Sequence, residues 1–269
     1  MIEPPQYPQE FSSSVINLGT PVRYFPVKNL NRIGSLVAFF IFLIGAVGLF
    51  FYGIYSAYSS YQKHGISIVD DKLIVPVIIA IVLFLLGILA GWSAFDNWNK
   101  GVLLYGQGFA LRSRKGVKTW RWDEIVSMTA AVTRHYTNGI YTGTTHAYTL
   151  FNRQSEKLVL NDIFKKVEEL AEAIGQNLFP LLYERAAQEY NEGKLLTFGP
   201  VTTSKAGIQI GKKVYPWTEV KDVSIHQGTL KVSKKDGGWF SGATASAAAI
   251  PNLRVLLAII DQVVGLKTS

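Results

Sequence analysis

Two long uncharged apolar stretches constrain this chain more than any other feature of its sequence. Residues 33–55 and 73–92 contain no Asp, Glu, Lys or Arg. A helix rises 1.5 Å per residue, so each stretch is long enough to cross a hydrocarbon core of about 30 Å. We therefore expect two transmembrane helices joined by an external loop at residues 56–72. The alternative is a pair of buried helices in the core of a soluble protein.

Basic residues near the ends of the two stretches predict their orientation. Arg23, Lys28 and Arg32 precede the first stretch, and Lys100 follows the second. The connection at residues 56–72 has two lysines balanced by two aspartates. Lys and Arg are enriched on the cytoplasmic side of membrane proteins, so we expect both termini in the cytoplasm.

Composition narrows the chemistry that the rest of the chain can perform. The chain has no cysteine, which excludes disulfide scaffolds, thiolate metal sites and cysteine nucleophiles. Residues 1–32 contain five prolines and no sustained hydrophobic period, so we expect a flexible cytoplasmic tail. Within this tail, residues 22–27 could instead add an edge strand to a following domain.

Short alternating runs of apolar and polar residues dominate after residue 97. They predict strands, and Asn138-Gly139 predicts a tight hairpin turn because a type I′ turn needs positive φ at both central residues. A helix is expected to begin at an N-cap on Asp162 and to end at Gly175. Two further helices are expected, at residues 179–191 and from Pro251 to Val263.

The order of these elements recurs along the chain. Residues 207–210 repeat the pattern of residues 108–111. Trp217 and Glu219 correspond to Trp122 and Glu124 and have the same spacing. We therefore expect two copies of one module, the first with a helical connector at residues 97–192 and the second at residues 193–269.

These elements resemble the bacterial pleckstrin-homology-like (PH-like) module, in which antiparallel strands are closed by one C-terminal helix. Residues 30–266 also resemble an uncharacterised bacterial membrane-protein family, a domain of unknown function, through the motifs at 121–125, 138–143 and 198–200. The resemblance implies an α+β membrane protein with two transmembrane helices, followed by two PH-like modules. It also implies the bacterial plasma (inner) membrane as the location, with a multi-pass topology, and it brings no catalytic residues.

Few side chains of this chain are candidates for catalysis or metal binding. The four histidines have no metal-ligand spacing, although His135 and His146 could face each other across the Asn138-Gly139 hairpin as a structural pair. The segment from Gly207 to Lys213 is one residue short of a phosphate-binding loop and reads as a basic hairpin turn. We therefore predict no catalytic residue, no metal and no cofactor.

One cluster of basic residues remains as a candidate binding site for anionic lipid headgroups. It lies on and around one predicted hairpin soon after the second apolar stretch, and its members are Arg112, Arg114, Lys115, Lys118 and Arg121. The alternative is that these charges only set the topology. Basic residues beside a membrane contribute about 1 kcal/mol each to binding an anionic surface.

The function expected from the sequence is a membrane-anchored cytoplasmic platform that binds or scaffolds other molecules. The alternative is a small transporter or channel component that assembles through its transmembrane helices. The expected partners are the lipid bilayer and an unidentified protein, with self-association left open. Nucleic acid is not expected, because the basic charge is accompanied by no recognised reading helix or stacking motif.

Overall fold

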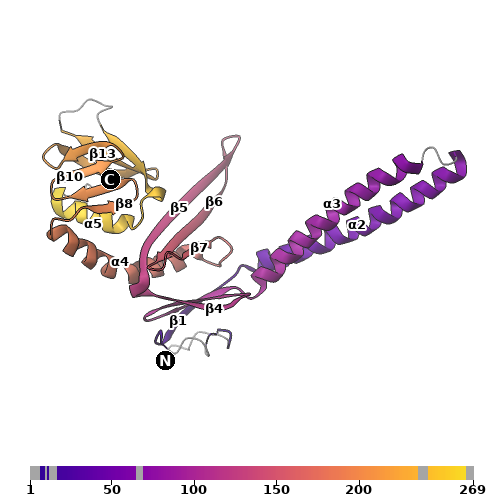
Figure 1. The fold of residues 1–269 in the computed structure, drawn as a ribbon, viewed down its shortest axis with the longest axis horizontal. Coiled ribbons are helices and arrows are strands. Elements are labelled where there is room, and N and C mark those ends of the chain that lie inside the picture. The colour runs from indigo at the N-terminus through magenta and orange to yellow at the C-terminus, as the bar shows by residue number, and fades with distance from the viewer. Residues whose placement is uncertain (1–6, 10, 12–16, 65–68, 236–241, 265–269) are drawn as a thin grey trace.

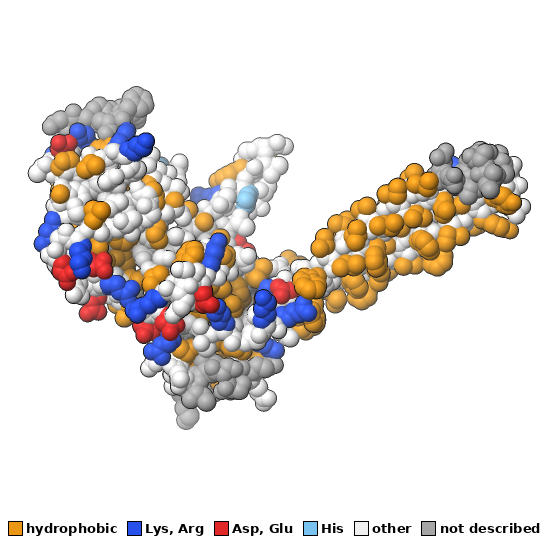
Figure 2. Space-filling view, viewed as in Figure 1, with side chains coloured by type: hydrophobic (Ala, Val, Ile, Leu, Met, Phe, Trp, Pro, Cys, Tyr) orange, Lys and Arg blue, Asp and Glu red, His pale blue; other side chains and the backbone are white. Residues whose placement is uncertain are grey.

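A computed structural model describes residues 7–9, 11, 17–64, 69–235 and 242–264 of the chain. Two long helices, α2 (Asn29–His64) and α3 (Val69–Trp98), extend together from a body of sheets and shorter helices (Figure 1). Both helices are long and apolar enough to cross a membrane. Most of their apolar side chains are exposed rather than packed against the body (Figure 2), which argues against two core helices of a soluble domain.

The two helices are longer than the apolar stretches that predicted them. Residues 56–64 continue α2, and residues 69–72 begin α3, so most of the expected external loop is helical. No Gly or Pro interrupts residues 56–64, and nothing there ends the helical hydrogen bonding. Residues 65–68 lie outside the described part of the chain.

Glycines on α3 allow the two helices to pack closely. A Cβ atom added at Gly87 would lie 3.4 Å from the Cβ of Phe42, and one added at Gly91 would lie 2.9 Å from Cδ2 of Phe39. The spacing of Gly87 and Gly91 matches the small-xxx-small pattern that brings membrane helices together.

The first sheet corrects the expectation of a flexible tail. Residues 21–26 form a strand, β1 (Pro21–Pro26), which pairs in antiparallel register with β2 (Gly101–Tyr105). Phe25 and Val27 are buried in the main core. The sheet continues through β3 (Gly108–Ser113) and β4 (Gly116–Arg121), in the order β1-β2-β3-β4. The α2–α3 pair is therefore an insertion between two neighbouring strands of one sheet.

A second sheet follows a one-turn 3₁₀ helix, η2 (Trp122–Glu124), in the order β5-β6-β7. Its strands are β5 (Ile125–Thr137), β6 (Ile140–Asn152) and β7 (Lys157–Asn161). The predicted turn is confirmed, since φ is 51° at Asn138 and 79° at Gly139. The expected pairing of the two histidines is wrong: His135 lies opposite Gly143, and His146 lies opposite Val132, because His135 is three residues before Asn138 whereas His146 is seven residues after Gly139.

The helix that closes the first half is continuous, which corrects another expectation. Helix α4 (Val167–Asn191) runs through both Gly175 and Pro180, so it is one helix rather than two. It begins after Lys166, which has φ of 57°, and Asp162 does not cap it. The face that starts at Val167 and Leu170 continues beyond Gly175, and burial of that whole face outweighs the local stop signal.

The second half repeats the strand order of the first. One sheet has the order β11-β10-β9-β8 and the other has the order β12-β13-β14, followed by a closing helix. The elements are β8 (Leu196–Phe198), β9 (Val201–Ser204), β10 (Gly207–Ile210), β11 (Lys213–Pro216), β12 (Val220–His226), β13 (Thr229–Lys234), β14 (Ala243–Ser246), the 3₁₀ helix η3 (Ala247–Ala249) and α5 (Leu253–Val264). Where the first half carries the α2–α3 pair, the second has only the two residues Gly199 and Pro200 between β8 and β9.

Hydrogen bonds around the two tryptophans also correspond. The indole N–H of Trp122 donates to the carbonyl of Gly106, in the β2–β3 turn, at 3.2 Å, and that of Trp217 donates to the carbonyl of Ser204, the last residue of β9, at 2.8 Å. The backbone carbonyls of Glu124 and Glu219 each accept an N–H bond at 2.9 Å. The hydrogen bond that the two halves share is therefore accepted by the backbone of the glutamate rather than by its carboxylate.

The two halves share one hydrophobic core. This core includes Phe109 and Leu150 from the first half, Leu178 from α4, and Leu230 and Leu256 from the second half. Asn252, just before α5, also joins them, because its side chain accepts from the N–H of Met128 and donates to the carbonyl of Val126, both at 2.9 Å. The pair of modules forms one packed body.

Candidate functional site

The junction between the α2–α3 pair and the body is short and well connected. The N–H of Lys28 donates to the carbonyl of Ile163, and the N–H of Lys165 donates to the carbonyl of Pro26, both at 2.8 Å. Across the base of the pair, the guanidinium of Arg32 donates to the carbonyl of Lys100 at 3.3 Å. The first two bonds join the segment before α2 to the segment before α4, and the third joins the base of α2 to the residues that follow α3.

The tip of the β3–β4 hairpin lies against the end of α3. The guanidinium carbon of Arg114 is 4.8 Å from the ring centre of Trp92 and 4.7 Å from that of Phe95, which are cation–π distances. A hollow of about 360 Å³ separates the hairpin from the end of α3, and Arg112 and Trp98 contribute to its walls. Lys and Arg side chains also gather at the base of the helix pair in Figure 2.

The structure divides the five basic residues expected to bind headgroups. Arg112, Arg114 and Lys115 lie on or beside the turn that faces α3. Lys118 instead pairs with the Glu156 carboxylate at 2.7 Å, and Arg121 pairs with Asp123 at 3.1 Å. The hairpin therefore places Arg112, Arg114 and Lys115 near its tip, and it places Lys118 and Arg121 beside carboxylates.

A groove of about 310 Å³ runs between the β5–β6 hairpin, α4 and the segment that leads into α5. Its walls are mainly apolar, and they come from both modules. Arg254 and Glu172 form a two-point ion pair across its rim, with Nη1 of Arg254 at 3.0 Å from Oε1 of Glu172. The groove joins a more open and more polar hollow beside His146, with Tyr148 and Glu168 shared between the two.

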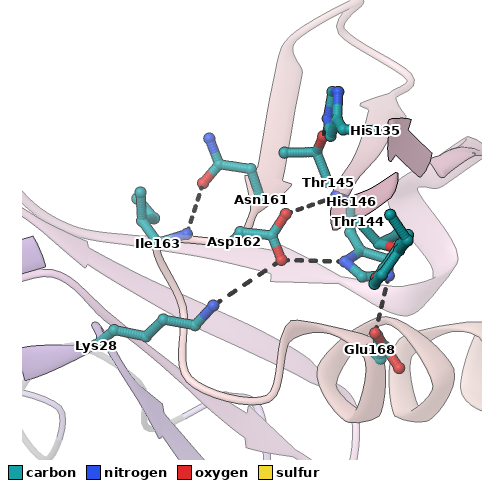
Figure 3. A network of polar contacts seen from close by, with 10 residues as sticks. Lys28, His135, Thr144, Thr145, His146, Asn161, Asp162, Ile163 and Glu168 are labelled. Atoms are coloured by element: carbon teal, nitrogen blue, oxygen red, sulfur yellow. Dashed lines mark hydrogen bonds and ion pairs between the residues drawn. The ribbon is translucent and has the colours of Figure 1, made fainter. Parts of the chain in front are cut away.

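A polar network lies at the polar end of this groove (Figure 3). Nδ1 of His146 is 3.0 Å from Oδ1 of Asp162, and Nε2 of His146 is 2.8 Å from Oε1 of Glu168. Asp162 also accepts the backbone N–H of His146 and lies 4.0 Å from the ammonium of Lys28. The Asp162 carboxylate therefore links β6 to the base of α2, and the ring of His146 links β6 to Glu168 on α4.

Sequence spacing did not reveal this network, because His146, Asp162 and Glu168 lie on three different elements. Burial by itself raises the pKa of the Asp162 carboxyl, but hydrogen bonds from the backbone and ring of His146 outweigh burial and lower that pKa. Among the described residues no group of three or more His, Asp or Glu side chains could hold a metal ion. The arrangement is that of a structural clamp.

The lowered pKa of Asp162 predicts a pH-dependent contribution to stability. A depressed carboxyl pKa stabilises the fold above the unfolded value of about 3.9, and this stabilisation is lost as the pH falls through the folded pKa. We expect Asp162→Asn to lower the free energy of unfolding by about 1–2 kcal/mol at pH 7, and by much less near pH 3. Thermal unfolding of the full chain in detergent at both pH values measures this, with Asp222→Asn in β12 as the control. A loss that is equal at both pH values would contradict the prediction.

Comparison with known proteins matches residues 1–267 to a family described as a family of unknown function, DUF6585. The match covers β1 as well as the helices and both modules, in agreement with the expected resemblance to an uncharacterised family. No curated protein matches the chain.

Proposed function

The chain belongs to the DUF6585 family of unknown function, and from the structure we propose that it is a membrane-anchored binding platform. In this proposal α2 and α3 cross the bacterial plasma membrane, and the body is a pair of PH-like modules on the cytoplasmic side. The role is binding or scaffolding rather than catalysis, and the anionic lipid around the anchor is the first ligand.

The strand order supports the PH-like assignment. Each half consists of a four-stranded antiparallel sheet, a three-stranded antiparallel sheet and a closing helix, α4 or α5. The β1 strand completes this set in the first half, so that module comprises residues before and after the helix pair. The proposed side of the membrane is supported by the basic residues Arg23, Lys28, Arg32 and Lys100, which flank the apolar parts of the helix pair in the sequence.

The contact between the β3–β4 hairpin and α3 carries the proposal of lipid binding. Trp92 lies at the end of the uncharged stretch, where interfacial aromatic residues belong. Because Arg114 stacks on Trp92 and Phe95, the hairpin tip is held at the level of the headgroups. Lys115 follows Arg114 in the same turn, and Arg112 lies two residues before Arg114 in β3, so an anionic headgroup at this level meets three cations from one hairpin.

We expect a variant that carries Arg112→Gln, Arg114→Gln and Lys115→Gln to lose most of the preference of the full chain for anionic lipid. At about 1 kcal/mol per basic residue, each replacement weakens binding about fivefold. Native mass spectrometry of the detergent-solubilised protein, titrated with phosphatidylglycerol or phosphatidylcholine, measures this preference.

Two matched variants complete the experiment. Lys212→Gln with Lys213→Gln removes charges from the β10–β11 turn of the second module, and it should leave the lipid preference intact. Lys118→Gln with Arg121→Gln should have a small effect, because carboxylates already offset those charges. Equal binding of phosphatidylglycerol by the wild-type protein and the triple variant would leave the hairpin only a role in topology.

A further inference from the structure

The β5–β6 hairpin extends far beyond the sheet to which it belongs. Its strands have thirteen residues each, but β7 pairs only with residues 147–151 of β6. The corresponding hairpin of the second module, β12–β13, has strands of seven and six residues. We name residues 130–146 the arm. The repeat thus provides an internal comparison, in which only the module that carries the helix pair has an arm.

The tip of the arm is apolar, aromatic and exposed. Tyr136, Ile140 and Tyr141 are 59%, 70% and 56% exposed, and the rings of Tyr136 and Tyr141 meet edge to face at 5.9 Å. Residues 125–152 include no Asp or Glu, and their only charged residue is Arg134. An exposed apolar cluster of this kind marks a contact site, and tyrosine is a side chain that membrane interfaces favour.

The arm and the α2–α3 pair start from the same place. Lys28, at the base of α2, and His146, at the base of the arm, both contact the carboxylate of Asp162 (Figure 3). The arm and the helix pair then leave the body as the two limbs of a V (Figure 1). The tip of the arm therefore points toward the side on which the membrane lies.

The length of the arm suits a contact with the membrane surface. His146 lies eight positions after Asn138 at the turn, and at about 3.3 Å per position this part of the arm extends about 26 Å. The apolar part of α2 begins at Ile33, four residues after Asn29, or about 6 Å along the helix axis. The arm is thus longer than the distance from the start of α2 to its apolar part, and it leaves the body on the same side as the helices (Figure 1), so its tip is able to reach the level of the headgroups.

We propose that the tip of the arm is a second membrane contact, in which Tyr136, Ile140 and Tyr141 enter the interfacial region of the leaflet that surrounds the base of α2 and α3. This inference rests on the proposed function, because it requires that the helices span the bilayer. The arm and the β3–β4 hairpin then hold the first module at two points, so that its sheet has a fixed inclination to the membrane surface.

The absence of cysteine from the chain allows a direct test by single-site labelling. Thr137→Cys, labelled with an environment-sensitive fluorophore, reports on the tip in the full chain reconstituted in phosphatidylcholine–phosphatidylglycerol liposomes. Thr229→Cys, beside the β12–β13 turn, is the matched control. We expect lipids with a spin label on the headgroup to quench the fluorophore at residue 137 several-fold more than the one at residue 229.

A third label separates failure of the arm from failure of the anchor. Leu89→Cys lies within α3, and lipids with a spin label in the middle of the acyl chain should quench it. If residue 89 is quenched and residue 137 behaves like residue 229, the arm does not touch the membrane and only this inference is overturned. If residue 89 is not quenched, the transmembrane anchor itself is wrong.

A variant and a control in detergent decide which contact is made. With Tyr136, Ile140 and Tyr141 all changed to Ser, the quenching at residue 137 should fall to the level of residue 229, and the buried core should be unaffected because the tip lies outside it. If the fluorescence of the label at residue 137 shifts in detergent and the shift grows with protein concentration, a second copy of the chain binds along the open strand edges of the arm. This result would overturn the membrane assignment.

Discussion

A chain in which residues 29–98 are replaced by Asn-Gly should fold as a soluble protein, whereas the fragment that begins at residue 97 should not. In the shortened chain Pro26 still pairs with Gly101, and a six-residue loop (Val27, Lys28, the inserted Asn-Gly, Asn99 and Lys100) takes the place that the two-residue connection Gly199-Pro200 has in the second module. The truncated fragment lacks β1, so β2 becomes an unpaired edge and the core loses Phe25 and Val27.

The expected difference between these two proteins is large. Loss of a buried large apolar side chain costs about 2–5 kcal/mol, and a whole domain is stable by about 5–15 kcal/mol. Size-exclusion chromatography and circular dichroism should find a monodisperse protein with a cooperative transition for the excision, and aggregation for the truncation. A fragment from residue 97 that unfolds at the temperature of the excised protein would show that β1 is dispensable.

The second large effect is expected at two glycines that occupy equivalent places in the two modules. A Cβ atom added at Gly108 would lie 2.2 Å from the carbonyl oxygen of Trp120, and one added at Gly207 would lie 2.2 Å from the carbonyl oxygen of Tyr215. Backbone atoms of a paired strand cannot move aside without a large cost in free energy. We expect Gly108→Ala and Gly207→Ala each to destabilise the protein by about 3 kcal/mol, at the upper end of overpacking costs.

Gly106→Ala is the control for this pair, because no atom lies within 4 Å of the added Cβ and the backbone needs no positive φ there. Thermal unfolding of the full chain in detergent, followed by circular dichroism, compares the three variants. If the structural equivalence of the two modules is correct, the two destabilising variants should lower the transition temperature by similar amounts. Retention of the wild-type transition by either variant would contradict the close strand approach.

Local patterns were sufficient for most elements of this fold. The uncharged stretches predicted two long apolar helices, and alternation predicted the strands that follow residue 97, because helix and strand periods depend on neighbours in the sequence. The Asn138-Gly139 turn and the basic turn at Gly211 were also predictable, since positive φ is a property of single residues.

Other features depended on contacts that local patterns do not encode. Gly175 looked like the end of a helix, but the buried face of α4 continues across it. The sequence showed the basic cluster as a group of Lys and Arg residues close together in the chain. Only the fold distinguishes Arg114, which stacks on α3, from Lys118, which pairs with Glu156. The aromatic tip of the arm gave no signal by itself, because its meaning comes from its exposure and its direction.

The sequence by itself determined that this chain has two helices able to cross a membrane and a β-rich body built from a repeated order of elements. Only the tertiary structure decided that β1 belongs to the first module, because its partner β2 lies 75 residues further along the chain, beyond both helices. It also decided the network of His146, Asp162 and Glu168. Pairing energy between distant segments appears only when the chain has closed the loop between them, so no local period records it.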